Sequence, residues 1–134
     1  MPQEHSVGII LTNKDQYLFL HYTKGHWGFV KGNVENNETP EETARRELKE
    51  ETGITTVFFT KEFFEREEYF YKREGKTIHK EVEYFLGETP ETIVTLSKEH
   101  TEYKWLPSQE AINLLSFPQG KELLRKVEEF KRYH

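Results

Sequence analysis

Short runs of hydrophobic residues, separated by charged and turn-forming residues, occupy most of the chain. Residues 7–11 and 17–22 are rich in aliphatic and aromatic side chains, and the polar residues 13–15 between them have the length of a hairpin turn. This pattern predicts two paired strands. Further strand-like runs lie at residues 56–64, 69–71, 78–86 and 103–106. We expect these runs to extend the same sheet.

A helix is predicted to begin after Thr39 and to end at Gly53. Thr39 can cap the helix, Pro40 suits its first position, and Glu42 completes a Thr-x-x-Glu capping box. A glycine placed after the last turn is typical of a helix C-terminus. The preceding segment, residues 24–37, holds three glycines and several asparagines, so we expect mostly loop with a brief extended stretch.

Two more helices are predicted at residues 108–115 and 121–133, divided by Pro118 and Gly120. The order of two strands, a helix, several strands and then helices indicates the α/β class, with a mixed sheet covered by helices on both sides. A length of 134 residues matches one ordinary domain, so a single domain is expected over residues 1–134. The pattern leaves the strand order open.

Composition limits the partners that this chain can have. Charged residues make up 32% and the net charge is -5, which repels polyphosphates and favours divalent cations, so a phosphate ligand would need metal ions or local lysines. The absence of cysteine excludes disulfides and thiol chemistry and fits a reducing compartment. No run reaches the roughly 18 apolar residues of a membrane span. We expect a soluble, cytoplasmic protein without a membrane partner.

Three glutamates share one face of the predicted helix at residues 40–52. Relative to Glu47, Glu50 lies about 60° to one side and Glu51 about 40° to the other. Ala44 and Leu48, the apolar residues in mid-helix, fall beside this face. Like charges at this spacing cost roughly 0.2 to 0.5 kcal/mol per pair, and more when partly desolvated. Divalent cations such as Mg²⁺ are natural partners for such carboxylates.

The alternative is a solvated glutamate-rich helix that pairs with its own basic residues, but the wider pattern favours a metal site. The segment GNVENNETPEETARRELKEETGI contains Gly32, five residues, Glu38, seven residues, Arg46-Glu47-Leu48, one residue, Glu50-Glu51, one residue and Gly53-Ile54. This spacing satisfies the Nudix box, which average composition would produce roughly once in 10⁸ placements. The chain therefore resembles the Nudix hydrolases.

That resemblance implies an α/β/α sandwich with a loop-helix-loop catalytic box, and cleavage of a nucleoside diphosphate linkage by attack of water on phosphorus. It implies Mg²⁺ or Mn²⁺ as cofactor. The matching metal-binding groups are the Gly32 carbonyl and the carboxylates of Glu47, Glu50 and Glu51. By the same resemblance Arg46, paired with Glu38, orients the helix, and either Glu47 or Glu51 acts as the base. A carboxylate suits that role.

Three other stretches resemble asymmetrical diadenosine tetraphosphate (Ap4A) hydrolases: HWGFVKGNVE from residue 26, YKREGKTIHKEVEYFLG from residue 71 and LSKEHTEYKWL from residue 96. This resemblance implies cleavage of Ap4A to ATP and AMP. It assigns phosphate binding to Lys31 and Lys80, and it brings Glu99 to the metals as a further catalytic and metal-binding residue. An aromatic clamp on adenine would use Tyr71 and Phe117.

The chain departs from that subfamily beside the box. Asn33 stands where animal members carry histidine, so its contact with substrate is an open prediction, and Val30 replaces the usual proline before Lys31. Each assigned residue also has a simpler interpretation. Lysines are usually solvated, and aromatic residues, 14% of this chain, usually fill the core.

Other functions remain as alternatives. Another Nudix pyrophosphohydrolase would act on an RNA 5′ end, a nucleoside triphosphate or a diphosphoinositol phosphate. A nucleic-acid substrate is disfavoured because the chain offers no wide basic surface. A non-catalytic Nudix-fold ligand-binding module is also disfavoured, because such modules can lose a box carboxylate and this chain retains all of them. The sequence does not specify an oligomeric state.

Overall fold

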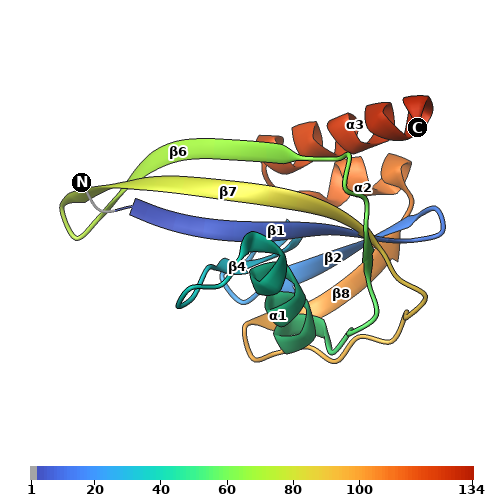
Figure 1. Ribbon diagram of the computed structural model, residues 1–134, viewed down its shortest axis with the longest axis horizontal. Helices are drawn as coiled ribbons and strands as arrows, with labels where there is room; N and C mark the ends of the chain where they lie inside the picture. Colours follow the sequence, from blue (N-terminus) through green and yellow to red (C-terminus); the bar gives the residue numbers. More distant parts are fainter. Residues whose placement is uncertain (1–2) are drawn as a thin grey trace.

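Eight strands form one mixed sheet over residues 3–134, the part of the chain that the computed structural model describes (Figure 1). The strands are β1 (Gln3–Asn13), β2 (Gln16–Tyr22), β3 (Trp27–Gly28), β4 (Val30–Asn33), β5 (Phe58–Phe59), β6 (Glu65–Arg73), β7 (Lys76–Glu88) and β8 (His100–Leu106). The helices are α1 (Pro40–Thr52), α2 (Ser108–Leu114) and α3 (Pro118–Tyr133). Within residues 3–134, no helix combines the length and apolarity that crossing a membrane requires.

Strand β1 is the centre of the sheet. It pairs in parallel with β7 along nearly its whole length, from Gln3 opposite His79 to Thr12 opposite Glu88. Its other edge is shared, since β4 pairs with residues 6–9 and β2 pairs with residues 12–13. Strand β6 adds to β7, and β8 adds to β2. Two different strands, β4 and β2, therefore lie one after the other along one edge of β1. The box loop follows β4, so it begins at this shared edge.

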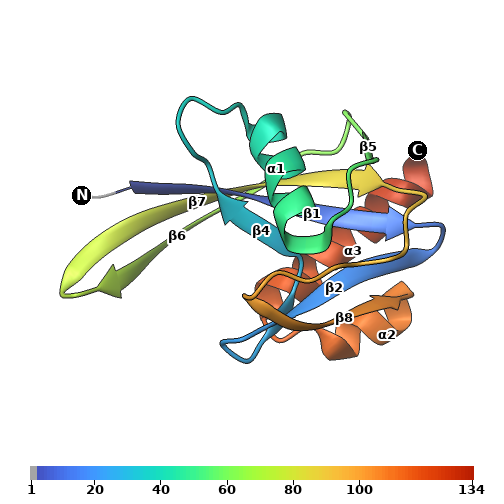
Figure 2. The ribbon, with the colours of Figure 1, turned by 90° about the horizontal axis from the view of Figure 1, so that it is seen from below.

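Alternating side chains of the sheet build two hydrophobic cores on its opposite faces. Val7 and Ile9 of β1 pack with Leu48 of α1 on one face. Ile10, the next residue along β1, points to the other face and packs with Leu124 of α3. Figure 2 shows α1 and α3 on opposite sides of the central strands. The expected layered arrangement of helices on both sides of a mixed sheet is confirmed.

Helix α1 begins and ends where the sequence predicts. The Thr39 side chain accepts a hydrogen bond from the Glu42 N–H at 3.2 Å, and the Glu42 carboxylate accepts one from the Thr39 N–H at 2.8 Å. Gly53 ends the helix at φ 77°, and its N–H donates to the Lys49 carbonyl. Local hydrogen bonds thus define both ends of the box helix.

The strand predicted at residues 56–64 is wrong for most of its length, because only Phe58–Phe59 joins the sheet. The N–H groups of Thr55 and Thr56 instead donate to the Glu91 carboxylate, at 3.1 and 2.7 Å. Phe58 is 66% exposed, so its aromatic side chain does not occupy a buried position of the sheet. Tertiary hydrogen bonds here override the β-propensity of the segment. In contrast, β6 is longer than the predicted residues 69–71.

The two glycines Gly53 and Gly120 should respond to alanine with opposite signs. Gly53→Ala should lower the free energy of unfolding by about 1 kcal/mol, because alanine is strained at a left-handed φ. Gly120 lies in the first turn of α3 without a positive φ, and an added Cβ would make ordinary contact with Leu115 at 3.4 Å. Gly120→Ala should therefore raise the free energy of unfolding by about 0.4 to 1 kcal/mol. Urea denaturation measures both, and equal signs would contradict this assignment.

Candidate active site

The Arg46 side chain joins the box loop, β4 and α1. Its Nε and Nη2 donate to the two carboxylate oxygens of Glu38 at 2.6 and 3.0 Å. Its Nη1 donates to Glu47 at 2.8 Å and Glu50 at 3.1 Å, and Nη2 also donates to the Asn33 carbonyl at 2.8 Å. The bond from Arg46 is the largest contribution to the lowered pKa of Glu38, about 2. Arg46 thereby holds the box helix against β4.

Gly32 allows Glu47 to approach the backbone of β4. A Cβ added at Gly32 would overlap the Glu47 carboxylate. Gly32 pairs with Val7 in the sheet, so its backbone has no freedom to move away. Any side chain at position 32 would therefore displace the Glu47 carboxylate from its bond with Arg46, because that carboxylate lies beside the Gly32 peptide.

The three glutamates on the shared face of α1 differ in exposure: Glu51 is buried, Glu47 is intermediate and Glu50 is exposed. The side chains of Glu47 and Glu51 are 12% and 4% exposed, whereas Glu50 is 58% exposed. Burial, followed by the neighbouring Glu51, raises the pKa of Glu47 to about 8. Burial, followed by the charge of Glu99, raises the pKa of Glu51 to about 7. The fold thus holds two carboxylates where their charged forms need a nearby cation.

The buried imidazole of His100 faces Glu51 but does not supply this cation. Its Nε2 lies 3.2 Å from Glu51 Oε1, a distance within ion-pair range, yet the two atoms lack hydrogen-bond geometry. Burial lowers the pKa of His100, which favours the neutral ring. The other ring nitrogen, Nδ1, lies 3.0 Å from the Ser97 hydroxyl.

The donor set fits a hard divalent cation. Among residues 3–134, both Glu51 oxygens are buried without a hydrogen-bond partner, which is costly for a polar group unless another ligand satisfies it. Glu47, Glu50, Glu51 and the Gly32 backbone line one cavity of about 590 Å³, and Glu99 lines its wall from the loop before β8. Oxygen donors alone suit Mg²⁺ or Mn²⁺ better than a softer metal.

A second group of potential metal ligands lies elsewhere, on β6 and β7. In the described part of the chain, Glu68, His79 and Glu81 bring ligand atoms within 4.8 Å of one another, closer than the box glutamates come. These side chains already have partners, however. His79 Nε2 lies 2.7 Å from Glu68, and Arg66 donates to Glu81 at 2.5 Å. The box is the better fit to a cation, because the Glu51 oxygens lack such compensation.

Lysines supply positive charge to the same cavity. Lys31 and Lys80 both line it, and burial followed by the charge of Lys80 lowers the pKa of Lys31. Lys80 Nζ donates to Asn33 Oδ1 at 3.2 Å and to Glu4 at 3.4 Å, and the Ser6 hydroxyl donates to the same Asn33 oxygen at 2.6 Å. Asn33 therefore positions Lys80, and the cavity presents carboxylates and ammonium groups together.

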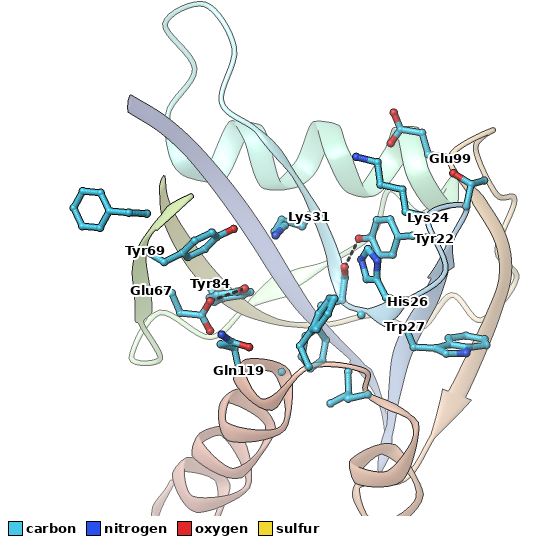
Figure 3. Close-up of a pocket in the computed structure, with 17 residues that line it drawn as sticks. Tyr22, Lys24, His26, Trp27, Lys31, Glu67, Tyr69, Tyr84, Glu99 and Gln119 are labelled. Atoms are coloured by element: carbon cyan, nitrogen blue, oxygen red, sulfur yellow. Dashed lines mark hydrogen bonds between the residues drawn. The ribbon is translucent and has the colours of Figure 1, made fainter. Parts of the chain in front are cut away.

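An aromatic cavity of about 810 Å³ adjoins this one, and Lys31 and Glu99 line both. Figure 3 shows Glu99 at one end and Tyr69 at the other, with Lys31 between them. Phe117 lines the aromatic cavity at the start of α3, and its ring lies 5.0 Å from that of His26. Lys31, which the sequence predicted to bind phosphate, thus lies where the charged cavity meets the aromatic cavity.

The structure does not bring Tyr71 and Phe117 together. The Tyr71 hydroxyl donates to Glu4, beside Lys80, and Tyr71 lies outside the aromatic cavity. Tyr69, two residues earlier on the same face of β6, lines that cavity with Phe117. The cavity also has lining residues that the sequence pattern did not indicate: Tyr22, His26, Glu67, Tyr84 and Gln119. Alternation along β6 could have indicated Glu67 and Tyr69 as a pair on one face.

The structure thus sets a carboxylate cluster beside two lysines and an aromatic cavity, on an α/β/α layered fold. The model of the NUDIX domain matches residues 2–127, so the chain belongs to the Nudix family. It is a Nudix hydrolase, and enzymes of this family generally use divalent metal ions.

Its relatives include asymmetrical bis(5'-nucleosyl)-tetraphosphatases. The mouse (Mus musculus) enzyme is 37% identical over 121 residues, which cover 86% of this chain and 80% of the relative. The Caenorhabditis elegans enzyme is 36% identical over 124 residues, covering 90% and 88%. A solved C. elegans Ap4A hydrolase binary complex superposes with a TM-score of 0.83 at 30% identity, covering 98% and 99% of the two chains.

The metal-free protein should lose stability as the pH rises. The pKa values of Glu47 and Glu51 are about 8 and about 7 in the folded state, against 4.5 for an ordinary glutamate, so the folded state binds more protons between these limits. In EDTA, the unfolding free energy that these groups contribute should therefore fall from about pH 4.5 to about pH 8. Glu51→Gln should flatten this fall, because an amide does not ionise.

Mg²⁺ at 100 times its dissociation constant should restore about 2.7 kcal/mol to the unmodified protein. It should restore much less to Glu51→Gln. The matched control is Glu41→Gln on the exposed side of the same helix, which should keep the full response to Mg²⁺. Thermal unfolding with and without EDTA measures all three proteins. An unchanged Mg²⁺ response in Glu51→Gln would contradict the metal-site assignment.

Proposed function

We propose that this chain hydrolyses diadenosine tetraphosphate asymmetrically to ATP and AMP, with Mg²⁺ or Mn²⁺ as cofactor. The observation that supports it best is the junction at Lys31 and Glu99, where the carboxylate cavity meets an aromatic cavity large enough for a nucleoside. A long dinucleoside polyphosphate has both chemical parts, a flat base and an extended polyanion. The identity with asymmetrical tetraphosphatases supports the same substrate.

In this proposal Glu47, Glu50, Glu51 and Glu99 hold the metal together with the Gly32 carbonyl. When bound, divalent cations offset charge on the phosphate oxygens and lower the pKa of an attacking water. Glu47 or Glu51 accepts the proton of that water, a role that their raised pKa values suit. The water oxygen bonds to the phosphorus nearest one adenosine as the bridging bond to the leaving ATP breaks.

Lys31 and Lys80 hold the phosphate chain in this proposal. Both ammonium groups lie in a cavity that otherwise carries negative charge, so they draw the polyanion toward the carboxylates and keep its phosphorus in reach of water. Phe117 and Tyr69 offer ring surfaces to a base, and stacking of this kind contributes roughly 1 to 3 kcal/mol. Tyr71 would act on the substrate only indirectly, because its hydroxyl bonds to Glu4, which in turn bonds to Lys80.

Incubation of the purified protein with Ap4A and Mg²⁺ in ¹⁸O-labelled water tests the proposal. We expect ATP and AMP, with the label in AMP, because water attacks the phosphorus next to one adenosine. A Glu51→Gln preparation controls for contaminating activity. No turnover of Ap4A, together with release of pyrophosphate from nucleoside triphosphates or RNA ends, would retain the Nudix hydrolase and overturn the proposed substrate.

Substitution of Lys31 should weaken substrate binding more than chemistry. Lys31→Met should lower kcat/KM for Ap4A about 10- to 100-fold, mainly through KM, since it removes charged hydrogen bonds to phosphate worth roughly 1.5 to 3 kcal/mol. Lys49→Met is the matched control, since that residue is exposed on α1 and lines neither cavity. Steady-state kinetics with both variants measures the difference. A Lys31→Met enzyme with unchanged KM would contradict phosphate binding by Lys31.

A further inference from the structure

Glu67 is a carboxylate inside the aromatic cavity that the proposed catalysis does not use. It lies on β6 opposite Val82, and it shares a face of that strand with Tyr69. Figure 3 shows Glu67 beside Tyr84 and Gln119, at the part of the cavity away from Glu99. The Tyr84 hydroxyl donates to it at 3.4 Å. Glu67 lines only the aromatic cavity, not the cavity of the box carboxylates.

The Glu67 carboxylate is not explained by an ion pair with another residue of the described chain. Within residues 3–134, Glu67 takes part in no salt bridge at 4 Å or less, whereas the neighbouring Glu65 pairs with Lys126 at 2.8 Å. Burial raises the pKa of Glu67, and the positive charge of Lys31 opposes this effect. A partly buried carboxylate with one long hydrogen bond has free acceptor capacity that faces the cavity.

The chemistry of the cavity separates two kinds of contact with a base. Ring faces of Tyr69 and Phe117 stack on any base, because every base has a π-face. The edge of the base must then be read by polar side chains. An ionised carboxylate only accepts hydrogen bonds, so Glu67 favours an edge that donates. Gln119 both donates and accepts, so it tolerates either kind of edge.

We infer that Glu67 is a specificity-determining residue, which accepts a hydrogen bond from the exocyclic amino group of adenine and disfavours bases without a donor at that edge. This inference rests on the proposed function, because it takes the aromatic cavity as the binding site for one nucleoside of the substrate. The stacking surfaces alone would accept any base, and Glu67 would make the site prefer adenine.

The test compares Ap4A with the tetraphosphate of two purine ribosides, in which hydrogen replaces each 6-amino group. The unmodified protein should show at least about a tenfold higher kcat/KM for Ap4A, because the analogue leaves a partly buried carboxylate with only its long hydrogen bond from Tyr84. Glu67→Ala should bring this ratio close to one, and Glu67→Gln should give an intermediate ratio. The ratio compares two substrates of one protein preparation, so a loss of folded protein does not change it.

Glu68→Gln is the matched control, because Glu68 is the next residue of β6 and its side chain lies on the other face, next to His79. Its ratio should equal that of the unmodified protein. A ratio near one in the unmodified protein, or the same ratio in Glu67→Ala, would overturn the inference while Ap4A hydrolysis stands. If Ap4A is not hydrolysed at all, the proposed function fails instead. Calorimetry with AMP and purine riboside monophosphate then decides, since only a preference for AMP that Glu67→Ala abolishes upholds the role of Glu67.

Discussion

The fork of hydrogen bonds from Arg46 is the constraint on which the active site depends. All five N–H donors of its guanidinium are used, two toward Glu38 and one each toward Glu47, Glu50 and the Asn33 carbonyl. These acceptors come from the loop, the helix and β4. A lysine offers a single point of charge and could not join three pieces of chain in this geometry. Together with the packing of Leu48 on Val7 and Ile9, this fork holds α1 over the shared edge of β1.

That anchoring permits an arrangement that is unfavourable by itself. Glu51 is buried and Glu47 is mostly covered, and this burial is the main reason why the pKa of each carboxyl is raised. Capping at Thr39 and Gly53, and the absence of a Cβ at Gly32, keep the helix in place despite the cost of burying these carboxylates. The carboxylates cannot relax into water without breaking these contacts, so the fold holds them in an arrangement that suits the proposed cations.

Features that depend on a few neighbouring residues were predictable from the sequence. The capping box, the glycine C-cap and the face shared by the box glutamates follow from helix geometry, and the structure agrees with each. Helices on both faces of a mixed sheet were also expected. Residues 56–64 behave differently. Their aromatic and β-branched side chains predicted a strand, but most of the segment is not in the sheet, and the backbone at its start is held by hydrogen bonds to Glu91, which is distant in sequence.

The sequence by itself determined the box, its helix and the family to which they point, because these rest on spacing and local hydrogen bonds. Only the tertiary structure decided which side chains meet at the cavities. Tyr69 and Tyr71 share one face of β6, so alternation could not choose between them, and the register of β6 on β7 places Tyr69 in the cavity with Glu67 and Phe117. Register and strand order depend on pairing between residues that are far apart in the sequence, and a local pattern does not determine that pairing.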